Sequence, residues 1–504
     1  MTRRRLVLGV FLACAASTVV GARQTASDGR MACDRVSSIE LPDVRIAETV
    51  ALPAADAGPI RVAHCRVTGT IGTEIRFSLL LPDTWNGKFL MGGGGGFVGE
   101  VENQAQPSVN AGYATAGTDT GHKGSSADAS WAMNNAERQV NYGYLGVHRT
   151  AETAKAIVRR YYGTPESQAY FVGCSNGGRQ AMMEAQRFPD DFTGIVSGAP
   201  ALDFVGIAAQ FIKDIQAVFP DKQSLSTPVF STDVLKSIEA QIVDKCDAAD
   251  GVKDGLIDDP RSCKVDVAAL TGLTDPQRSA LKKVYAETTG PAEVLYPGQP
   301  VGGEGEGGEG EPAGWAAWIV GGGPQRAPQG PSLRFAFGTQ FFKYLVFGDP
   351  SWDYTQYDVS HARKDARLAG TFLNATDPDL GAFKAKGHKL IVWHGWSDPA
   401  LSALGTIKYY DQVQSRDSGA RDYIRMFLMP GVLHCGGGPG PSTVDWAAVL
   451  SDWVERGKAP DSIVARKLAA DGTVSRSRPL CVYPQRAQYK GTGSPDDAAS
   501  FVCK

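Results

Sequence analysis

Two short segments carry the residue types of nucleophilic catalysis, and in each a cysteine is the direct neighbour of the candidate reactive side chain. Ser175 lies in Gly173-Cys174-Ser175-Asn176-Gly177, and the second segment is His434-Cys435. The first has the G-x-S-x-G pattern, in which a sharp strand-to-helix turn exposes a serine hydroxyl. If Cys174 and Cys435 pair, one covalent bond joins the nucleophile segment to the segment of its base. These features predict a serine esterase.

The serine pattern needs structural context, because the chain contains 59 glycines. In so glycine-rich a chain roughly half a G-x-S-x-G match is expected by chance, and the alternative is a turn with an inert serine. Here the pattern occurs once, between an apolar run at Ala169–Gly173 and a helical pattern at Arg179–Arg187. A strand, a turn and a helix in this order are what a nucleophile elbow requires.

An acid and a base follow downstream, in the order Ser, Asp, His that this type of hydrolase uses. The predicted strand Lys389–Trp393 leads into His-Gly-Trp-Ser-Asp-Pro, which places Asp398 just beyond a strand end. The next predicted strand, Tyr423–Met429, leads to His434. His434 would take the proton of Ser175 during attack, and Asp398 would orient the imidazole and stabilise its charged form.

The other histidines fit the role of base less well. His394 lies only four residues before Asp398 and has no orienting partner further along, while His122 follows a polar loop and is expected to shape the pocket. The remaining ones have no strand-end context and are assigned to the surface or to structural roles: His64, His148, His361 and His388.

The tetrahedral intermediate needs two preorganised hydrogen-bond donors for its oxyanion. One is expected to be the backbone N–H of Asn176, the residue after the nucleophile. The other is expected from the run Gly92–Gly96, where backbone amides without side chains can approach a substrate, and Gly95 is favoured.

The elements that position these residues alternate between strands and helices, which predicts a mainly parallel α/β sheet. Further strands are expected at Arg76–Pro82, Gly87–Met91, Tyr113–Ala116 and Ile195–Gly198, and a helix over residues 146–162. The pattern changes between 203 and 370, where acidic turns and aromatic clusters replace it. We therefore expect a catalytic domain formed by residues 23–202 and 371–504, with an inserted lid at 203–370. The run Gly302–Glu311 is expected to be a mobile surface loop of that lid.

Composition indicates an exported enzyme. The net charge of −3 comes from dispersed charges of both signs, which gives no basic surface for nucleic acid. Residues 1–22 have the three parts of a signal peptide, and Sec and Tat export both remain open. No later segment is apolar enough to span a membrane. The oligomeric state is not indicated.

Cysteine usage agrees with export to an oxidising compartment. Nine cysteines less Cys14 of the leader leave an even number, which favours disulfides. Proximity in sequence suggests the pairs 33–65, 246–263 and 481–503 and leaves 174–435, although eight cysteines allow about 105 connectivities. The cysteines concerned are Cys33, Cys65, Cys174, Cys246, Cys263, Cys435, Cys481 and Cys503.

With these residues in view, the chain resembles the tannase and feruloyl esterase family, which includes the hydrolase of mono(2-hydroxyethyl) terephthalate. The resemblance runs from about residue 33 to the C-terminus. It rests on Gly173–Gly178, on Asp398 in HGWSDP, on His434-Cys435 followed by glycines, and on the segments at 92–97 and 118–122. It implies an α/β-hydrolase core with a lid, a Cys174–Cys435 disulfide and hydrolysis of aromatic carboxylic esters.

The resemblance also implies a structural Ca²⁺ site in the lid. Carboxylate and carbonyl oxygens are the ligands that Ca²⁺ prefers, but the spacing here is not that of an EF-hand. The alternative is a solvated acidic turn. The implied ligands are the carboxylates of Asp247, Asp250 and Asp254 and the carbonyls of Val252 and Leu256.

Substrate choice is the least determined part of the prediction. An aromatic acyl group is expected to stack on one or two lid rings, most of which should instead form the lid's own core. The candidates are Trp315, Trp318, Phe335, Phe337, Phe341, Phe342, Tyr344, Phe347 and Trp352. Esters of hydroxycinnamic acids come first, tannins second and terephthalate monoesters third. A binding protein without catalysis and a serine peptidase remain as alternatives.

Overall fold

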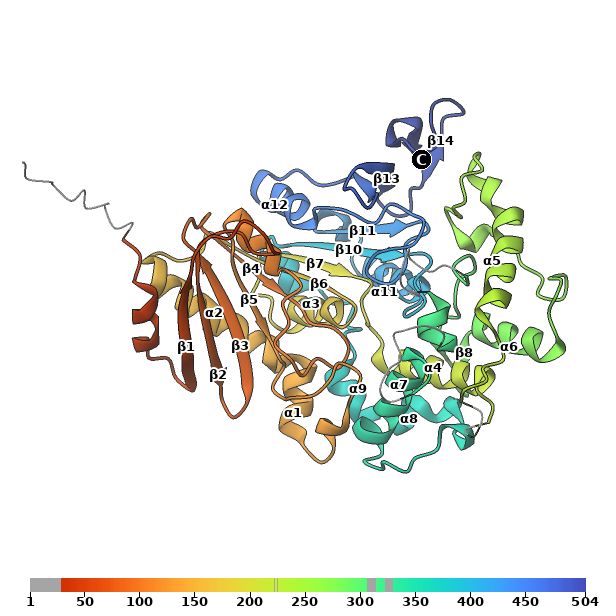
Figure 1. Cartoon of the computed structure of the whole chain (residues 1–504), viewed down its shortest axis with the longest axis horizontal. Coiled ribbons are helices and arrows are strands. Elements are labelled where there is room, and N and C mark those ends of the chain that lie inside the picture. The colour runs from red at the N-terminus through yellow and green to blue at the C-terminus, as the bar shows by residue number, and fades with distance from the viewer. Residues whose placement is uncertain (1–28, 222, 224, 306–313, 322–329) are drawn as a thin grey trace, which may run out of the picture.

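The computed structural model describes residues 29–504, with the exception of 222, 224, 306–313 and 322–329. The predicted signal peptide at 1–22 lies outside the described residues, as does the part of the glycine- and glutamate-rich run from 306 to 311. The described chain has a central sheet, a helical segment on one side of it and the C-terminal strands above it (Figure 1).

In the described residues, nine strands form one sheet in the order β1-β2-β3-β5-β4-β6-β7-β10-β11. The six strands from β5 to β11 in this order run parallel to one another, whereas the pairs β1–β2, β2–β3 and β3–β5 are antiparallel. The prediction of a parallel sheet therefore holds for its catalytic part, and the antiparallel β1 and β2 were not predicted. The strands are β1 (Val44–Leu52), β2 (His64–Ile71), β3 (Ile75–Pro82), β4 (Lys88–Gly92), β5 (Ala114–Thr118), β6 (Gln168–Cys174), β7 (Gly194–Gly198), β10 (Lys389–Gly395) and β11 (Ile424–Met429).

The parallel strands are mostly apolar and buried, as expected of strands whose two faces are both covered. In β10, Leu390 and Val392 pack against one set of helices, and Ile391 and Trp393 pack against the opposite layer. The first face is covered by α2 (Gly146–Tyr162), α3 (Asn176–Arg187) and α11 (Ala403–Arg416), and the second by α12 (Trp446–Arg456). Packing on both faces therefore fixes the carboxyl ends of the parallel strands and the turns that follow them.

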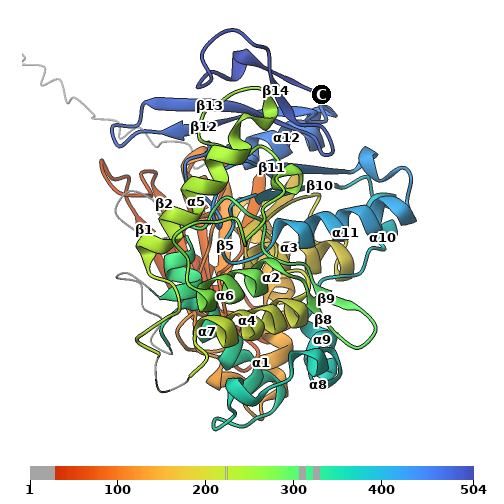
Figure 2. The ribbon, with the colours of Figure 1, turned by 90° about the vertical axis from the view of Figure 1, so that its right-hand side faces the viewer.

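The segment predicted as a lid is helical and lies beside the carboxyl ends of the parallel strands (Figures 1 and 2). Its own apolar core also takes Phe97 and Trp131 from the catalytic domain, so the two parts share one packed interface. The elements of this segment are α4 (Phe204–Val218), α5 (Thr232–Cys246), α6 (Asp275–Tyr285), β8 (Thr288–Thr289), β9 (Val294–Tyr296), α7 (Leu333–Gln340), α8 (Ala362–Asp365) and α9 (Arg367–Leu373).

The prediction of a mobile surface loop at 302–311 is wrong for its first residues, which are buried. Gly303 lies so close to the loop of the predicted acid that a Cβ there would meet Ser397 at 2.8 Å, and Ser397 donates to the carbonyl of Gly302. The Glu304 carboxylate accepts hydrogen bonds from the amides of Gly302 and Gly303 and from Tyr285. A charged side chain can be buried here because these donors replace its water.

The C-terminal part adds two small antiparallel ladders that lie above the sheet (Figure 2). Among the residues that the structure describes, no helix has the length and apolar character needed to cross a bilayer. The remaining elements are α1 (Ala136–Val140), α10 (Gly381–Ala385), β12 (Ser462–Leu468), β13 (Val474–Cys481), β14 (Ala487–Tyr489) and β15 (Phe501–Cys503).

Candidate active site

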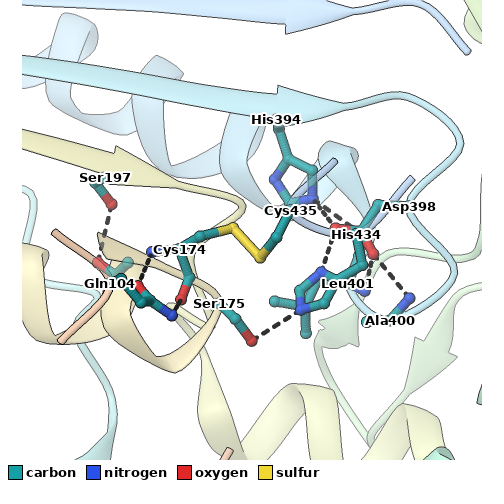
Figure 3. The surroundings of a disulfide bond; sticks show 11 residues. Gln104, Cys174, Ser175, Ser197, His394, Asp398, Ala400, Leu401, His434 and Cys435 are labelled. Atoms are coloured by element: carbon teal, nitrogen blue, oxygen red, sulfur yellow. Dashed lines mark hydrogen bonds and ion pairs between the residues drawn. A yellow bond between two sulfur atoms is a disulfide. The ribbon is translucent and has the colours of Figure 1, made fainter. Parts of the chain in front are cut away.

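The structure brings Ser175, His434 and Asp398 together at the carboxyl ends of β6, β11 and β10 (Figure 3). The Oγ of Ser175 lies 2.8 Å from Nε2 of His434, and Nδ1 of His434 lies 2.7 Å from Oδ2 of Asp398. Both separations are those of good hydrogen bonds. The three side chains therefore form one continuous chain from hydroxyl to carboxylate, in reach of proton transfer.

The turn that holds Ser175 explains why glycines surround it. Ser175 has φ 64° and ψ −124°, a backbone conformation that side chains rarely adopt, and it is the N-cap residue of α3. A Cβ on Gly173 would come within 2.4 Å of the carbonyl oxygen of Gly177. The two glycines are thus required for the close approach of β6 to the first turn of α3, and this approach aims the hydroxyl outward.

A disulfide connects the residues beside the nucleophile and the base. Cys174 and Cys435 are bonded with their Cα atoms 5.9 Å apart, across 261 residues of sequence. Cys435 has φ 63°, so the backbone next to His434 also lies in the left-handed region. The other pairs are Cys33–Cys65, Cys246–Cys263 and Cys481–Cys503. All eight cysteines of the described residues are therefore paired as proximity suggested.

The Asp398 carboxylate is buried and fully hydrogen-bonded. Its Oδ1 accepts the backbone amides of Ala400 and Leu401, while its Oδ2 accepts from His434 and lies 3.2 Å from Nε2 of His394. Burial alone would raise the pKa of Asp398, but His434 and His394 outweigh it and hold that pKa well below its ordinary value. Asp398 is therefore ionised at neutral pH.

The sequence discounted His394 as the base, and the structure agrees because His434 is the histidine at Ser175. What was not expected is that His394 also contacts Asp398. The Gly395-Trp396-Ser397 turn folds back, so His394 and Asp398 meet although they are close in sequence. The sequence does show a histidine at the end of the strand that leads to Asp398. It does not show the direction of the turn that brings the two side chains together.

Ser175 and His434 open into a cavity of about 420 Å³ between the catalytic domain and the lid. The wall is mostly apolar, and the lid contributes much of it. Trp318 meets the His434 ring edge to face at 5.1 Å and stacks on Phe337. The lining residues are Gly95, Gly96, Glu102, Gln104, Ser126, Ser175, Asn176, Ala201, Phe204, Ile207, Ala208, Phe211, Trp318, Leu333, Phe337, Phe341, Ala400, Leu401, His434 and Cys435.

Of the lid rings singled out from the sequence, Trp318, Phe337 and Phe341 line this cavity. The other rings pack in the lid core or on its rim, as expected of most of them: Trp315, Phe335, Phe342, Tyr344, Phe347 and Trp352. Sequence reasoning missed Phe204 and Phe211, which α4 presents to the cavity. The helical period shows which residues share a face, but not that this face meets the active site.

The predicted oxyanion donors lie at the cavity, but one of them is engaged. Asn176 is the first residue of α3, where backbone N–H groups have no partner within the helix. The amide of Gly95 instead donates to Oε2 of Glu102 at 2.7 Å. Burial raises the pKa of Glu102, and the Gly95 N–H opposes that rise. For Gly95 to bind an oxyanion, the Glu102 carboxylate has to move aside.

Gln104 is a second residue that the sequence did not indicate. Its Oε1 accepts the backbone N–H of Cys174 at 2.8 Å, and its Nε2 donates to the Cys174 carbonyl at 3.4 Å (Figure 3). The side chain thus closes over the backbone beside the nucleophile. No motif marks this residue, because its role depends on where the loop after β4 returns to the sheet.

His122 does not line the cavity. It is buried, stacks on Trp131 at 3.7 Å and lies with Nε2 2.9 Å from the carbonyl of Phe97. Burial lowers the pKa of His122 to about 4, so it is neutral at physiological pH. It shapes the pocket only indirectly, by bracing the end of the glycine loop.

The acidic turn at 247–256 lies in the segment predicted as the lid, and none of its residues lines the cavity at Ser175. The carboxylate of Asp247 accepts the amides of Asp254 and Gly255, and Asp254 forms an ion pair with Arg478. Oδ2 of Asp250 is buried without a hydrogen-bond partner among the described residues, and the nearest cation is Nη1 of Arg478 at 3.9 Å.

Comparison with known proteins agrees with this geometry. The family model described as tannase and feruloyl esterase matches residues 60–504. The chain belongs to the tannase and feruloyl esterase family. An uncharacterised esterase of Xanthomonas campestris is 33% identical over 96% of this chain and 93% of its own length. The mono(2-hydroxyethyl) terephthalate hydrolase of Piscinibacter sakaiensis is 32% identical over 90% of this chain and 87% of its own.

A solved relative shows the same fold. The crystal structure of feruloyl esterase B from Aspergillus oryzae superposes with a TM-score of 0.82 at 27% identity, covering 94% of this chain and 99% of that chain. The predicted α/β-hydrolase fold is thereby confirmed, and this member of the tannase and feruloyl esterase family is a carboxylic ester hydrolase.

Proposed function

We propose that this protein is an exported serine hydrolase that cleaves esters of hydroxycinnamic-type aromatic acids through an acyl-enzyme on Ser175. The observation that carries the proposal is the hydrogen-bonded chain from Ser175 through His434 to Asp398, which opens into an apolar cavity. The disulfides are consistent with an oxidising compartment outside the cytoplasm.

Each group has a defined task in the proposed reaction. His434 removes the Ser175 proton as the hydroxyl attacks the ester carbonyl, and it later gives that proton to the leaving alcohol. Asp398 holds Nδ1–H of His434 and stabilises the imidazolium. The oxyanion is bound by the Asn176 amide and by Gly95 once Glu102 releases it. In the second half of the reaction His434 removes a proton from water as the water attacks the acyl-enzyme, and it then returns that proton to Ser175.

The cavity wall favours an aromatic acyl group with few polar substituents. Apolar side chains supply most of the lining, five of them aromatic, and rings of this kind stack on aromatic substrates. Among the described residues of the lining none is a lysine or an arginine, so a terephthalate carboxylate finds no cation there. Glu102 would repel that carboxylate. A galloyl group would bring three hydroxyls to a wall with few hydrogen-bond partners.

We predict that kcat/KM falls in the order methyl ferulate, methyl gallate, terephthalate monoester. Each buried hydroxyl left without a partner costs about 1–3 kcal/mol, so the gallate should be hydrolysed at least tenfold less efficiently. The terephthalate monoester should be slower by at least roughly 100-fold, because its second carboxylate would be buried unpaired. Steady-state kinetics on the three purified esters measure this order.

The same panel separates the proposal from its alternatives. Efficient hydrolysis of the terephthalate monoester would contradict the proposed acyl preference but not the triad. Cleavage of peptide amides at rates similar to those of the esters would favour a serine peptidase. Binding of all three esters without turnover would indicate a binding protein on a hydrolase scaffold.

We further propose that the lid carries a structural Ca²⁺ ion. The residues fit this ion, because the buried Oδ2 of Asp250 lacks a partner and lies in a turn closed by the Cys246–Cys263 disulfide. Asp247, Asp250 and Asp254 would supply carboxylates, and Val252 and Leu256 would supply carbonyls. Asp254 would be shared with Arg478, which already neutralises part of its charge.

Chelation is expected to lower the melting temperature without an immediate loss of turnover, since none of the implied ligands lines the cavity at Ser175. Free Ca²⁺ at about 100 times its Kd would stabilise the folded state by about 2.7 kcal/mol. Calorimetry with and without chelator, together with metal analysis of the purified protein, tests this. Asp250→Asn should abolish the chelator effect. Identical melting curves in Ca²⁺ and in chelator would rule the ion out.

A further inference from the structure

The buried histidine that precedes the acid is hydrogen-bonded on both ring nitrogens. His394 is the penultimate residue of β10 and has no exposed surface. Its Nδ1 lies 2.8 Å from Oγ1 of Thr406, and its Nε2 lies 3.1 Å from the carbonyl oxygen of Leu401 and 3.2 Å from Oδ2 of Asp398. Figure 3 shows the rings of His394 and His434 one above the other beside Asp398.

These partners determine where the proton of the ring is. A carbonyl oxygen and a carboxylate oxygen can only accept, so Nε2 has to carry the hydrogen that points between Leu401 and Asp398. Nδ1 then accepts from the hydroxyl of Thr406, which can donate. A neutral imidazole with its hydrogen on Nε2 satisfies every group, and we assign this tautomer.

We propose that His394 is a positioning residue for catalysis, which holds the Asp398 carboxylate so that its Oδ2 faces Nδ1 of His434. This inference rests on the triad roles proposed above. His394 does not itself line the cavity, and its contacts toward the site are the Leu401 carbonyl and the Asp398 carboxylate, of which only Asp398 belongs to the triad.

Asp398 needs such a partner because its two oxygens are held differently. Oδ1 is held by two backbone amides of its own loop, and Oδ2 would otherwise be held by His434 alone. His434 must carry and release a proton in every cycle, so its own bond to Oδ2 changes in strength during turnover. The bond from His394 stays constant and prevents rotation of the carboxylate. It also supplies a donor to a charge that has no contact with water.

His434 and His394 are the two side chains that lower the pKa of Asp398, and the other ionisable groups described near its loop do not bind its carboxylate. Tyr296 is also close, and burial first and Asp398 second raise its pKa, so it stays neutral. Arg334 lies near the same loop, but it donates to the carbonyl of Pro399 and pairs with Asp214. Neither of these residues has a hydrogen bond to the Asp398 carboxylate among the bonds of the described residues.

Two substitutions that differ in the placement of one amide nitrogen test the proposal. The amide nitrogen of asparagine lies near the position of Nδ1, whereas that of glutamine reaches the position of Nε2. His394→Asn therefore loses the donor to Asp398, and His394→Gln keeps one. We expect His394→Asn to lower kcat roughly 10- to 100-fold, the range typical of a lost outer hydrogen bond at metal sites. KM should change little, and His394→Gln should recover most of the loss.

The pH profile provides a readout that a merely structural role would not move. The pKa of Asp398 is depressed in the folded protein, so the carboxylate is ionised at all but very low pH. Loss of one donor in His394→Asn raises that pKa. Because Asp398 stabilises the charged form of the base His434, a changed hold on Asp398 should displace the acid limb of kcat/KM in His394→Asn relative to the wild type and to His394→Gln.

A remote histidine serves as the control for folding. His64 in β2 is also buried, and His64→Asn should leave kcat and the pH profile unchanged. Equal kcat and equal pH profiles for His394→Asn and the wild type would overturn the proposal. So would a His394→Gln variant that melts normally but is no more active than His394→Asn.

If His394→Asn does not fold, the comparison of His394→Gln with the wild type decides, since a loss above 100-fold would contradict the role. Failure of the triad itself would show separately, as turnover retained by Ser175→Ala.

Discussion

Replacing Ser175 with alanine is expected to lower kcat for aromatic esters roughly 10⁵- to 10⁶-fold, the loss typical of removing the nucleophile of a catalytic triad. The hydroxyl is the only triad atom that becomes covalently bonded to the substrate, and His434 has no other group to deprotonate in the structure described here. The residual rate would come from the oxyanion donors and from binding alone. Steady-state hydrolysis of methyl ferulate and of a p-nitrophenyl ester measures the loss.

The variant should otherwise resemble the wild type. Ser175 makes no side-chain capping bond to α3, so its removal should change the melting temperature little. Ser415→Ala, at an exposed position of α11, provides a matched serine control that should keep full activity. Rapid mixing of the wild type with the p-nitrophenyl ester should reveal an initial burst that Ser175→Ala lacks. A Ser175→Ala protein with more than about a hundredth of the wild-type kcat would contradict the acyl-enzyme mechanism, given the losses usual for triad nucleophiles.

Removing the Cys174–Cys435 disulfide should reduce both stability and turnover. A cross-link that spans 261 residues restricts the unfolded chain strongly, and the chain-entropy model gives about 5 kcal/mol as an upper value. The same bond joins the segments that hold positive φ at the nucleophile Ser175 and at Cys435, the residue after the base. Even a displacement of about 1 Å between reacting groups can cost roughly 100-fold in rate. We therefore expect the Cys174→Ser/Cys435→Ser protein to melt at a lower temperature and to turn over more slowly.

A second disulfide separates these two effects. Cys481 and Cys503 are joined across 22 residues at the C-terminal end, and their removal should cost about 3 kcal/mol at most by the same model. The Cys481→Ser/Cys503→Ser protein should therefore lose stability but keep its kcat at temperatures well below melting. If both double variants keep full kcat, the Cys174–Cys435 bond contributes to stability but not to the positioning of the nucleophile and the base. If the first variant also keeps its melting temperature, this bond contributes to neither.

The local geometry of the nucleophile could be predicted from the sequence because its causes are local. Gly173 and Gly177 allow a close approach that any side chain would block, and the apolar run before them forms a strand within a few residues. The strand ends ahead of Asp398 and His434 could be predicted for the same reason. Parallel strands that share one sheet bring their carboxyl ends to one edge, so the convergence of the three residues followed from their order.

The residues that surround the triad were decided by the tertiary structure. His394 reaches Asp398 because a turn folds back, Glu102 binds Gly95 because a loop returns to the glycine run, and Phe211 reaches the cavity because one face of α4 lies along it. A periodic pattern records which side chains share a face, but not which face of another element lies opposite. The buried glycines at 302–305 show the same limit. Their composition is typical of a solvated loop, yet contacts with Tyr285 and Ser397, distant in sequence, make burial favourable.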